Sequence, residues 1–190
     1  MVGKTWENKE NPCELLESFN SHFPRNVTKV VNFEAPVTGR PPRKLNFYKF
    51  DTDQKFLPCL AETFDLLSLA NNHILDQVKI GAETSNATYT IDNLEKFNIP
   101  YLGFGKTREK AWSHFMLEDK VALIAVSFTC WNNNNVVDCE EVPRITDDIF
   151  YIRSEIKRIK EKSPSASIGL LGHVGLEYMP YTFDYQRQIV

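Results

Sequence analysis

The sequence predicts a layered α/β protein, and three observations lead to this prediction. Apolar runs of strand length alternate with segments of helical spacing along the 190 residues. Hydrophobic residues make up 42% of the chain and charged residues 25%, a balance that favours a packed core over disorder. Residues 121–128 contain a run that is apolar on both faces, as in a strand covered on both sides.

Four segments have the spacing of helices with one apolar face. In the first, Leu15, Leu16 and Phe19 fall on the same side. In the longest, Asp147 and Asp148 lie at the start and basic residues lie near the end. The negative charges are then at the positive end of the helix dipole and the positive charges at its negative end, which is favourable. The predicted helices are residues 10–19, 54–63, 88–97 and 147–162, and a fifth begins at Tyr185.

Five runs rich in β-branched and aliphatic residues are predicted as strands. Pro36 ends the first of them and Gly103 the third. A basic loop follows the first strand at residues 39–44, and an Asn-rich loop is expected at residues 131–135. The predicted strands are residues 29–33, 65–70, 99–102, 121–128 and 167–171.

Composition also excludes several classes of function. The net charge of -3 gives no general attraction for nucleic acid, so no nucleic-acid partner is expected. No run of about 18 apolar residues is present, so no transmembrane segment is expected. The four cysteines include no C-x-x-C pair, which argues against a thiolate zinc site. Their spacing demands no disulfide, and free thiols are expected.

Three of the predicted strands end in polar residues that can bind metal. Glu34 follows the first strand, Asn72 and His73 follow the second, and His173 follows the last. In layered α/β proteins, ligand sites form at the carboxyl ends of strands. Carboxylate oxygen, amide oxygen and imidazole nitrogen suit a divalent cation such as Mn, Zn or Fe. The sequence therefore predicts a divalent metal site, with a second histidine placed to protonate a leaving group.

Each of these residues also has a purely structural interpretation. A glutamate at a strand end often forms an ion pair, and consecutive asparagines tolerate the left-handed geometry of a turn. A histidine after a glycine is often structural. Asp76, three residues after His73, either orients that histidine or caps a helix. The joint placement at strand ends is what favours a functional site.

Five pieces of the chain together resemble the capsule-synthesis CapA family, the poly-γ-glutamate capsule biosynthesis proteins of bacteria. The Leu-Ala-Asn-Asn-His piece and the His-x-Gly-x-Glu-Tyr piece are the specific ones in combination. The pieces are residues 31–36 (VNFEAP), 68–76 (SLANNHILD), 90–94 (TIDNL), 101–105 (YLGFG) and 172–178 (GHVGLEY).

The resemblance implies a calcineurin-like metallophosphoesterase fold, an α-β-β-α sandwich formed by residues 1–190 as a single domain. It also implies roles for individual residues. Glu34, Asn72 and His173 are the expected metal ligands, and His73 is the expected catalytic residue beside a phosphate-type substrate. The residues expected to contact substrate are Asn32, Asn71, Asp76 and Glu177.

The chain departs from the family pattern at three places. A first strand ending in Gly-Asp and a final Gly-His-His-Pro-His motif are not found in it, and Val78 stands where glycine is usual. We therefore expect a domain that is partial at both ends and a metal site that lacks some ligands. Unpaired strand edges are the expected physical consequence.

Three hypotheses follow for the function. The first is a metal-dependent hydrolase that acts on a phosphoester or a γ-glutamyl amide. The alternative is a non-catalytic module that binds an anionic polymer, polyglutamate, or assembles with other capsule-synthesis proteins. The third is a domain that retains the scaffold alone. The resemblance places family members at the cell surface, although no anchor is recognised in the sequence.

Overall fold

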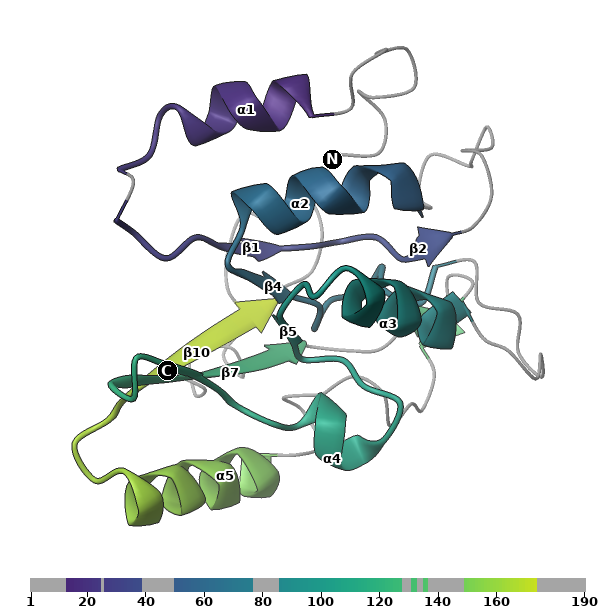
Figure 1. The fold of residues 1–190 in the computed structure, drawn as a ribbon. Coiled ribbons are helices and arrows are strands. Elements are labelled where there is room, and N and C mark those ends of the chain that lie inside the picture. Colours follow the sequence, from purple (N-terminus) through teal and green to yellow (C-terminus); the bar gives the residue numbers. More distant parts are fainter. Residues whose placement is uncertain are drawn as a thin grey trace, which may run out of the picture.

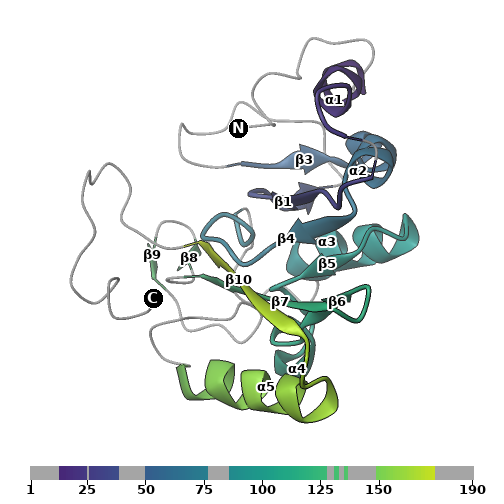
Figure 2. The same cartoon turned by 90° about the vertical axis from the view of Figure 1, so that its left-hand side faces the viewer.

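Two three-stranded sheets form the centre of the molecule (Figures 1 and 2). The computed structural model of the chain describes residues 13–24, 26–38, 50–76, 86–127, 131–132, 135–136 and 149–173. The first sheet is parallel, in the order β1 (Val30–Asn32), β4 (Leu66–Ser68), β5 (Tyr101–Leu102). The second has the order β10 (Ser167–His173), β7 (Val121–Ser127), β6 (Phe115–Leu117), and β6 is its antiparallel strand.

Helices connect the parallel strands, because a parallel pair cannot be joined by a tight hairpin. The turn η2 (Gln54–Phe56) leads into α2 (Leu57–Thr63), which lies between β1 and β4 in the chain. The helix α3 (Asn86–Lys96) connects β4 to β5, and α5 (Ile149–Lys162) lies between β7 and β10. The described residues also form the helices α1 (Glu14–Asn20) and α4 (Arg108–Ala111).

Alternate residues of β7 show how the layers are stacked. Leu123 and Ala125 belong to a core that also contains residues of α2, α3 and the first sheet. Ile124 and Val126 belong to a second core with Ile152 of α5. Because neighbouring side chains of a strand point to opposite faces, the first sheet lies on one side of β7 and α5 on the other. The predicted α-β-β-α sandwich is thereby confirmed.

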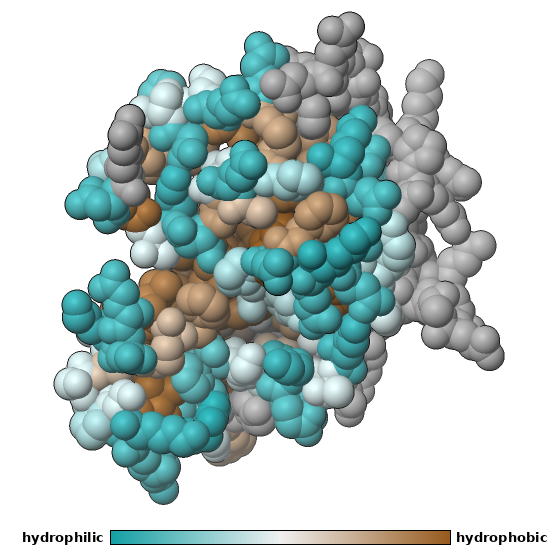
Figure 3. All heavy atoms as spheres, viewed as in Figure 1, coloured by the Kyte–Doolittle hydropathy of each residue, from teal (hydrophilic) through white to brown (hydrophobic). Residues whose placement is uncertain are grey.

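Gly103, directly after β5, packs tightly against residues of both sheets. A Cβ atom at this position would lie 2.7 Å from the Cβ atoms of both Ala70 and Ala125. Gly103 also has a φ of 79°, a conformation that favours glycine. The glycine therefore allows the end of β5 to lie close to Ala70 and to Ala125 of β7 in the second sheet. In Figure 3, apolar residues are visible between the hydrophilic outer layers.

Several short elements were not predicted. They are α4, β6, the parallel pair β2 (Val37–Thr38) and β3 (Thr52–Asp53), and the antiparallel pair β8 (Trp131–Asn132) and β9 (Asn135–Val136). The last pair corrects the prediction of a plain Asn-rich loop at residues 131–135. The basic loop at residues 39–44 and the helix predicted from Tyr185 lie outside the described residues.

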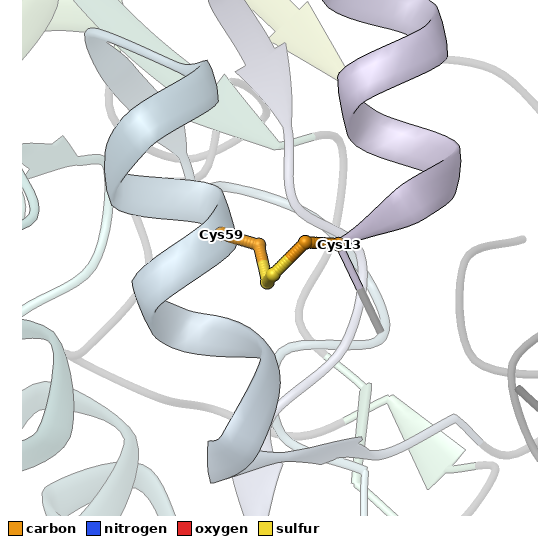
Figure 4. The surroundings of a disulfide bond; sticks show 2 residues. All are labelled: Cys13 and Cys59. Atoms are coloured by element: carbon orange, nitrogen blue, oxygen red, sulfur yellow. A yellow bond between two sulfur atoms is a disulfide. The ribbon is translucent and has the colours of Figure 1, made fainter. Parts of the chain in front are cut away.

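The expectation of free thiols is wrong for two of the cysteines. Cys13, at the start of α1, forms a disulfide with Cys59 of α2 (Figure 4). The packing of α1 on α2 brings the two Cα atoms to 5.2 Å, a normal distance for a disulfide. Cys130 and Cys139 lie outside the described residues. Within the described part of the chain, no helix has the length and hydropathy needed to cross a membrane.

Candidate metal site

Three strand ends meet at one edge of the sandwich. Glu34 lies two residues beyond β1, Asn72 lies four residues beyond β4, and His173 is the last residue of β10. β1 and β4 run parallel with Asn32 opposite Ser68, so their carboxyl ends reach the same edge. β10 belongs to the other sheet, and its end reaches the same place because the sheets are stacked. The site therefore draws on both sheets.

Two of the expected metal ligands, Asn72 and Glu34, face an imidazole nitrogen of the third, His173. His173 Nε2 lies 2.8 Å from Asn72 Oδ1 and 3.4 Å from Glu34 Oε1. The other ring nitrogen, Nδ1, lies 3.3 Å from Asn32 Nδ2. Two oxygen acceptors face Nε2 and an amide donor faces Nδ1, so Nε2 carries the proton in this network. The side chains of His173 and Glu34 are about one-third exposed, at 33% and 32%, which leaves the cluster open to solvent.

The buried Asn71 holds the loops of the site together. Its Nδ2 donates to Asn32 Oδ1 at 3.1 Å and to the backbone carbonyl of Phe33 at 3.0 Å. Its Oδ1 accepts the backbone N–H of His73 at 3.1 Å. Asn71 is 1% exposed, so its amide is engaged within the protein. This burial favours a positioning role over direct contact with a substrate, and the predicted substrate contact stays a prediction.

His73 is oriented by a buried carboxylate. Its Nδ1 lies 2.8 Å from Asp76 Oδ2, and the same oxygen accepts the backbone N–H of Phe50 at 2.8 Å. The Phe50 ring meets the imidazole edge to face, with centroids 4.3 Å apart. Because the carboxylate of Asp76 accepts a hydrogen bond, Nδ1 carries the proton and Nε2 is the nitrogen available for proton exchange. Of the two interpretations of Asp76, the orienting one matches these contacts.

Burial lowers the pKa of His173. The neighbouring Glu34 carboxylate opposes this effect and His73 reinforces it, and the net result is a pKa below the ordinary value of 6.5. The neutral imidazole is therefore the main form of His173 at neutral pH. A neutral imidazole is the form in which histidine binds metals.

The donor atoms fit one divalent cation. A carboxylate oxygen, an amide oxygen and an imidazole nitrogen come together, and the two oxygens already face the Nε2 proton that a cation would replace. The described ranges contain no group of three or more His, Cys, Asp or Glu side chains that could hold a metal. The set of Glu34, Asn72 and His173 differs from such a group because one of its donors is an amide.

A groove approaches the site along the strand edges. It encloses about 350 Å³ and is lined by β1 and β10, with His173 and Asn32 at the end where the ligands meet. Both strands are outer strands of their sheets, and Leu170 in the groove is 44% exposed. Among the described strands, these two outer edges therefore line the groove.

Most of the predicted site residues come together. Asn32, Glu34, Asn71, Asn72, His73, Asp76 and His173 form one connected network of contacts. Glu177 lies outside the described residues. Phe50 was missed by sequence reasoning, and no sequence signal marks it, because it reaches Asp76 from a distant loop through its backbone.

Comparison with known proteins agrees with the resemblance found in the sequence. A search of curated proteins gave no match. The family model described as bacterial capsule synthesis protein PGA_cap matches residues 3–190, nearly the whole chain. The chain therefore belongs to the bacterial capsule synthesis protein family.

Proposed function

We propose that this member of the capsule synthesis family is a metal-dependent hydrolase. The bond it cleaves is a phosphoester or a γ-glutamyl amide of poly-γ-glutamate. The observation that carries the proposal is the meeting of Glu34, Asn72 and His173 at three strand ends, with two oxygens facing one imidazole nitrogen. These three residues would hold one Mn, Zn or Fe ion, which would polarise a substrate oxygen and lower the pKa of a bound water.

In this proposal, His73 protonates the leaving group. Asp76 fixes the ring through Nδ1, so that the protonated imidazole donates from Nε2. The edge-to-face contact with the Phe50 ring limits the rotation of the His73 imidazole. Asn71 supports both parts of the site, because it bonds the His73 backbone on one side and Asn32 on the other.

The groove between β1 and β10 gives an extended substrate a path to these residues. Its volume of about 350 Å³ and its open side suit a chain that lies along the strands rather than a compact enclosed ligand. A linear polymer passing through it would bring its bonds one after another past His173.

Hydrolysis assays with the manganese-loaded protein test the proposal. The substrates are glycerophosphocholine and γ-glutamyl-p-nitroanilide, whose alkoxide and amine leaving groups both need a proton. We expect turnover of at least one of them, and a loss of about 100-fold in kcat for His73→Ala because general acid catalysis is removed. The control is His22→Ala, which changes an exposed histidine of the α1 end and should leave the rate unchanged.

A rate that survives His73→Ala would remove this residue from the mechanism. Failure to cleave either substrate, combined with saturable retention of poly-γ-glutamate by the metal-free protein, would favour the alternative of a non-catalytic binding or assembly module.

A further inference from the structure

The side-chain amide of Asn71 fits its surroundings in one orientation. Its two N–H groups donate to the Phe33 carbonyl at 3.0 Å and to Asn32 Oδ1 at 3.1 Å, and its oxygen accepts the backbone N–H of His73 at 3.1 Å. In the reversed orientation, the amide oxygen would face the Phe33 carbonyl and the amide hydrogens would face the His73 N–H. Backbone groups cannot exchange the roles of donor and acceptor, so they fix the orientation of Asn71.

The orientation of Asn32, the last residue of β1, follows from that of Asn71. Because Asn71 offers an N–H, Asn32 presents its oxygen to Asn71 and turns its amide nitrogen toward the other sheet. There Asn32 Nδ2 lies 3.3 Å from Nδ1 of His173. An amide nitrogen donates and does not accept, so Nδ1 must be the acceptor and carries no proton.

The contacts on the other side of the His173 ring agree with this assignment. Its Nε2 faces Asn72 Oδ1 at 2.8 Å and Glu34 Oε1 at 3.4 Å, and a carboxylate oxygen can only accept. A neutral imidazole has one ring proton, and both sides of the ring place it on Nε2. Residues of the first sheet and its loops thus select the tautomer of a histidine that belongs to β10 in the second sheet.

The proton therefore occupies the nitrogen that the proposed cation would bind. A histidine that binds a metal through one ring nitrogen keeps its proton on the other and donates it to an acceptor. In His173 that other nitrogen is Nδ1, and the group in front of it is the donor Asn32 Nδ2. Asn32 cannot turn its oxygen toward the ring without giving up its hydrogen bond with Asn71. Binding of a cation at Nε2 must therefore break a hydrogen bond of this chain.

From these contacts we infer that Asn32 is a positioning residue that holds metal-free His173 in the tautomer with the proton on Nε2, and that it thereby weakens cation binding. When a cation binds, Nε2 releases its proton to solvent and Nδ1 takes one up, so the ring stays neutral. The statement about the cation rests on the proposed function. The tautomer is a property of the metal-free protein and can be tested without a metal.

Long-range proton–nitrogen NMR spectra of the metal-free protein test the tautomer, because they separate protonated from unprotonated ring nitrogens. The signals of His173 are identified by their loss in His173→Ala. We expect Nδ1 without a proton in the wild type. Asn32→Asp keeps the size of the side chain and an acceptor for Asn71, but it faces Nδ1 with a carboxylate oxygen, so Nδ1 should become protonated. The signals of His22, an exposed histidine, should stay unchanged. A protonated Nδ1 in the wild type, or an unprotonated Nδ1 in Asn32→Asp, would overturn the inference.

Calorimetric titration with Zn²⁺ tests the effect on the cation. Asn32→Ala removes the donor at an exposed position and leaves Nδ1 free to donate to water, so zinc should bind about threefold to tenfold more tightly. A residue that supports the metal-bound form would show the opposite, a loss of about 10–100-fold. Unchanged or weaker zinc binding in Asn32→Ala would refute the opposition to the cation. If neither protein binds zinc and the tautomer is as stated, the proposed function fails and the role of Asn32 in the metal-free protein stands.

Discussion

The positions of the site's side chains depend on hydrogen bonds from a few buried residues. Asn71 and Asp76 are both buried, and both hold His73 in place. Asn71 accepts the backbone N–H of His73, and Asp76 bonds its ring. In the sequence Asn71 directly follows the predicted strand at residues 65–70, and the spacing of three between His73 and Asp76 already suggests their contact. What the sequence does not show is the second partner of Asp76, because Phe50 is 26 residues away along the chain.

Asp76→Ala leaves the Phe50 N–H and the His73 ring without their acceptor. We expect the free energy of unfolding to fall by about 1–3 kcal/mol, since a buried donor then lacks a partner. Urea unfolding of the metal-free protein measures this change. Asp76→Asn offers an oxygen of the same size at the same place and should lose less than half as much. Equal losses in the two variants would show that these hydrogen bonds are not the source of the stability.

Two elements are attached to the core by side-chain links that the sequence did not reveal. The helix α1 is joined to α2 by the Cys13–Cys59 disulfide, over a separation of 46 residues. The helix α5 is joined to the loop before β6 by Glu155, which accepts from His114 Nδ1 at 2.6 Å and from Arg158 at 2.6 and 2.8 Å. Such links depend on packing, and spacing along the chain does not indicate them.

Loss of the disulfide should destabilise the protein, because the cross-link restricts the unfolded chain. For a loop of 46 residues, we expect Cys13→Ser with Cys59→Ser to lower the free energy of unfolding by about 2–4 kcal/mol. Urea unfolding with and without a reductant measures the effect. The reductant should lower the stability of the wild type and leave the double variant unchanged. A wild type that is insensitive to complete reduction would contradict the prediction.

The attachment of α5 should weaken in acid. Burial raises the pKa of Glu155, but its hydrogen bonds with Arg158 and His114 outweigh this, and the net pKa lies below the ordinary value of 4.5. A lowered folded-state pKa gives stability that is present above about pH 4.5 and is lost as the pH falls through the folded value.

Glu155→Gln is the matched comparison, since it keeps the shape and does not titrate. We expect the wild type to exceed this variant in unfolding free energy at pH 7, with a difference that shrinks below about pH 4.5. Urea unfolding of both proteins over a pH series measures it. A difference that stays constant into strong acid would show that the Glu155 charge does not stabilise the fold.

The alternation of strands and helices was predictable, because the apolar run of β7 and the spacing in α2, α3 and α5 indicate it, whereas the two stacked sheets were expected from the family resemblance. The short strands β2 and β3 were not, since two residues each show no alternation. For the site, strand ends indicated the ligands, and the general rule for α/β proteins brought them together. Phe50 had no signal, because it contributes to the site through its backbone N–H.

Calorimetric titration of the metal-free protein with Mn²⁺ or Zn²⁺ tests whether the three strand ends form a metal site. We predict saturable binding of one cation per chain, weakened at least about tenfold in both His173→Ala and Asn72→Ala. His22→Ala, at an exposed position of the α1 end, should bind as the wild type does. Failure of the wild type to bind either cation, or equal losses in His22→Ala and His173→Ala, would contradict the proposed site.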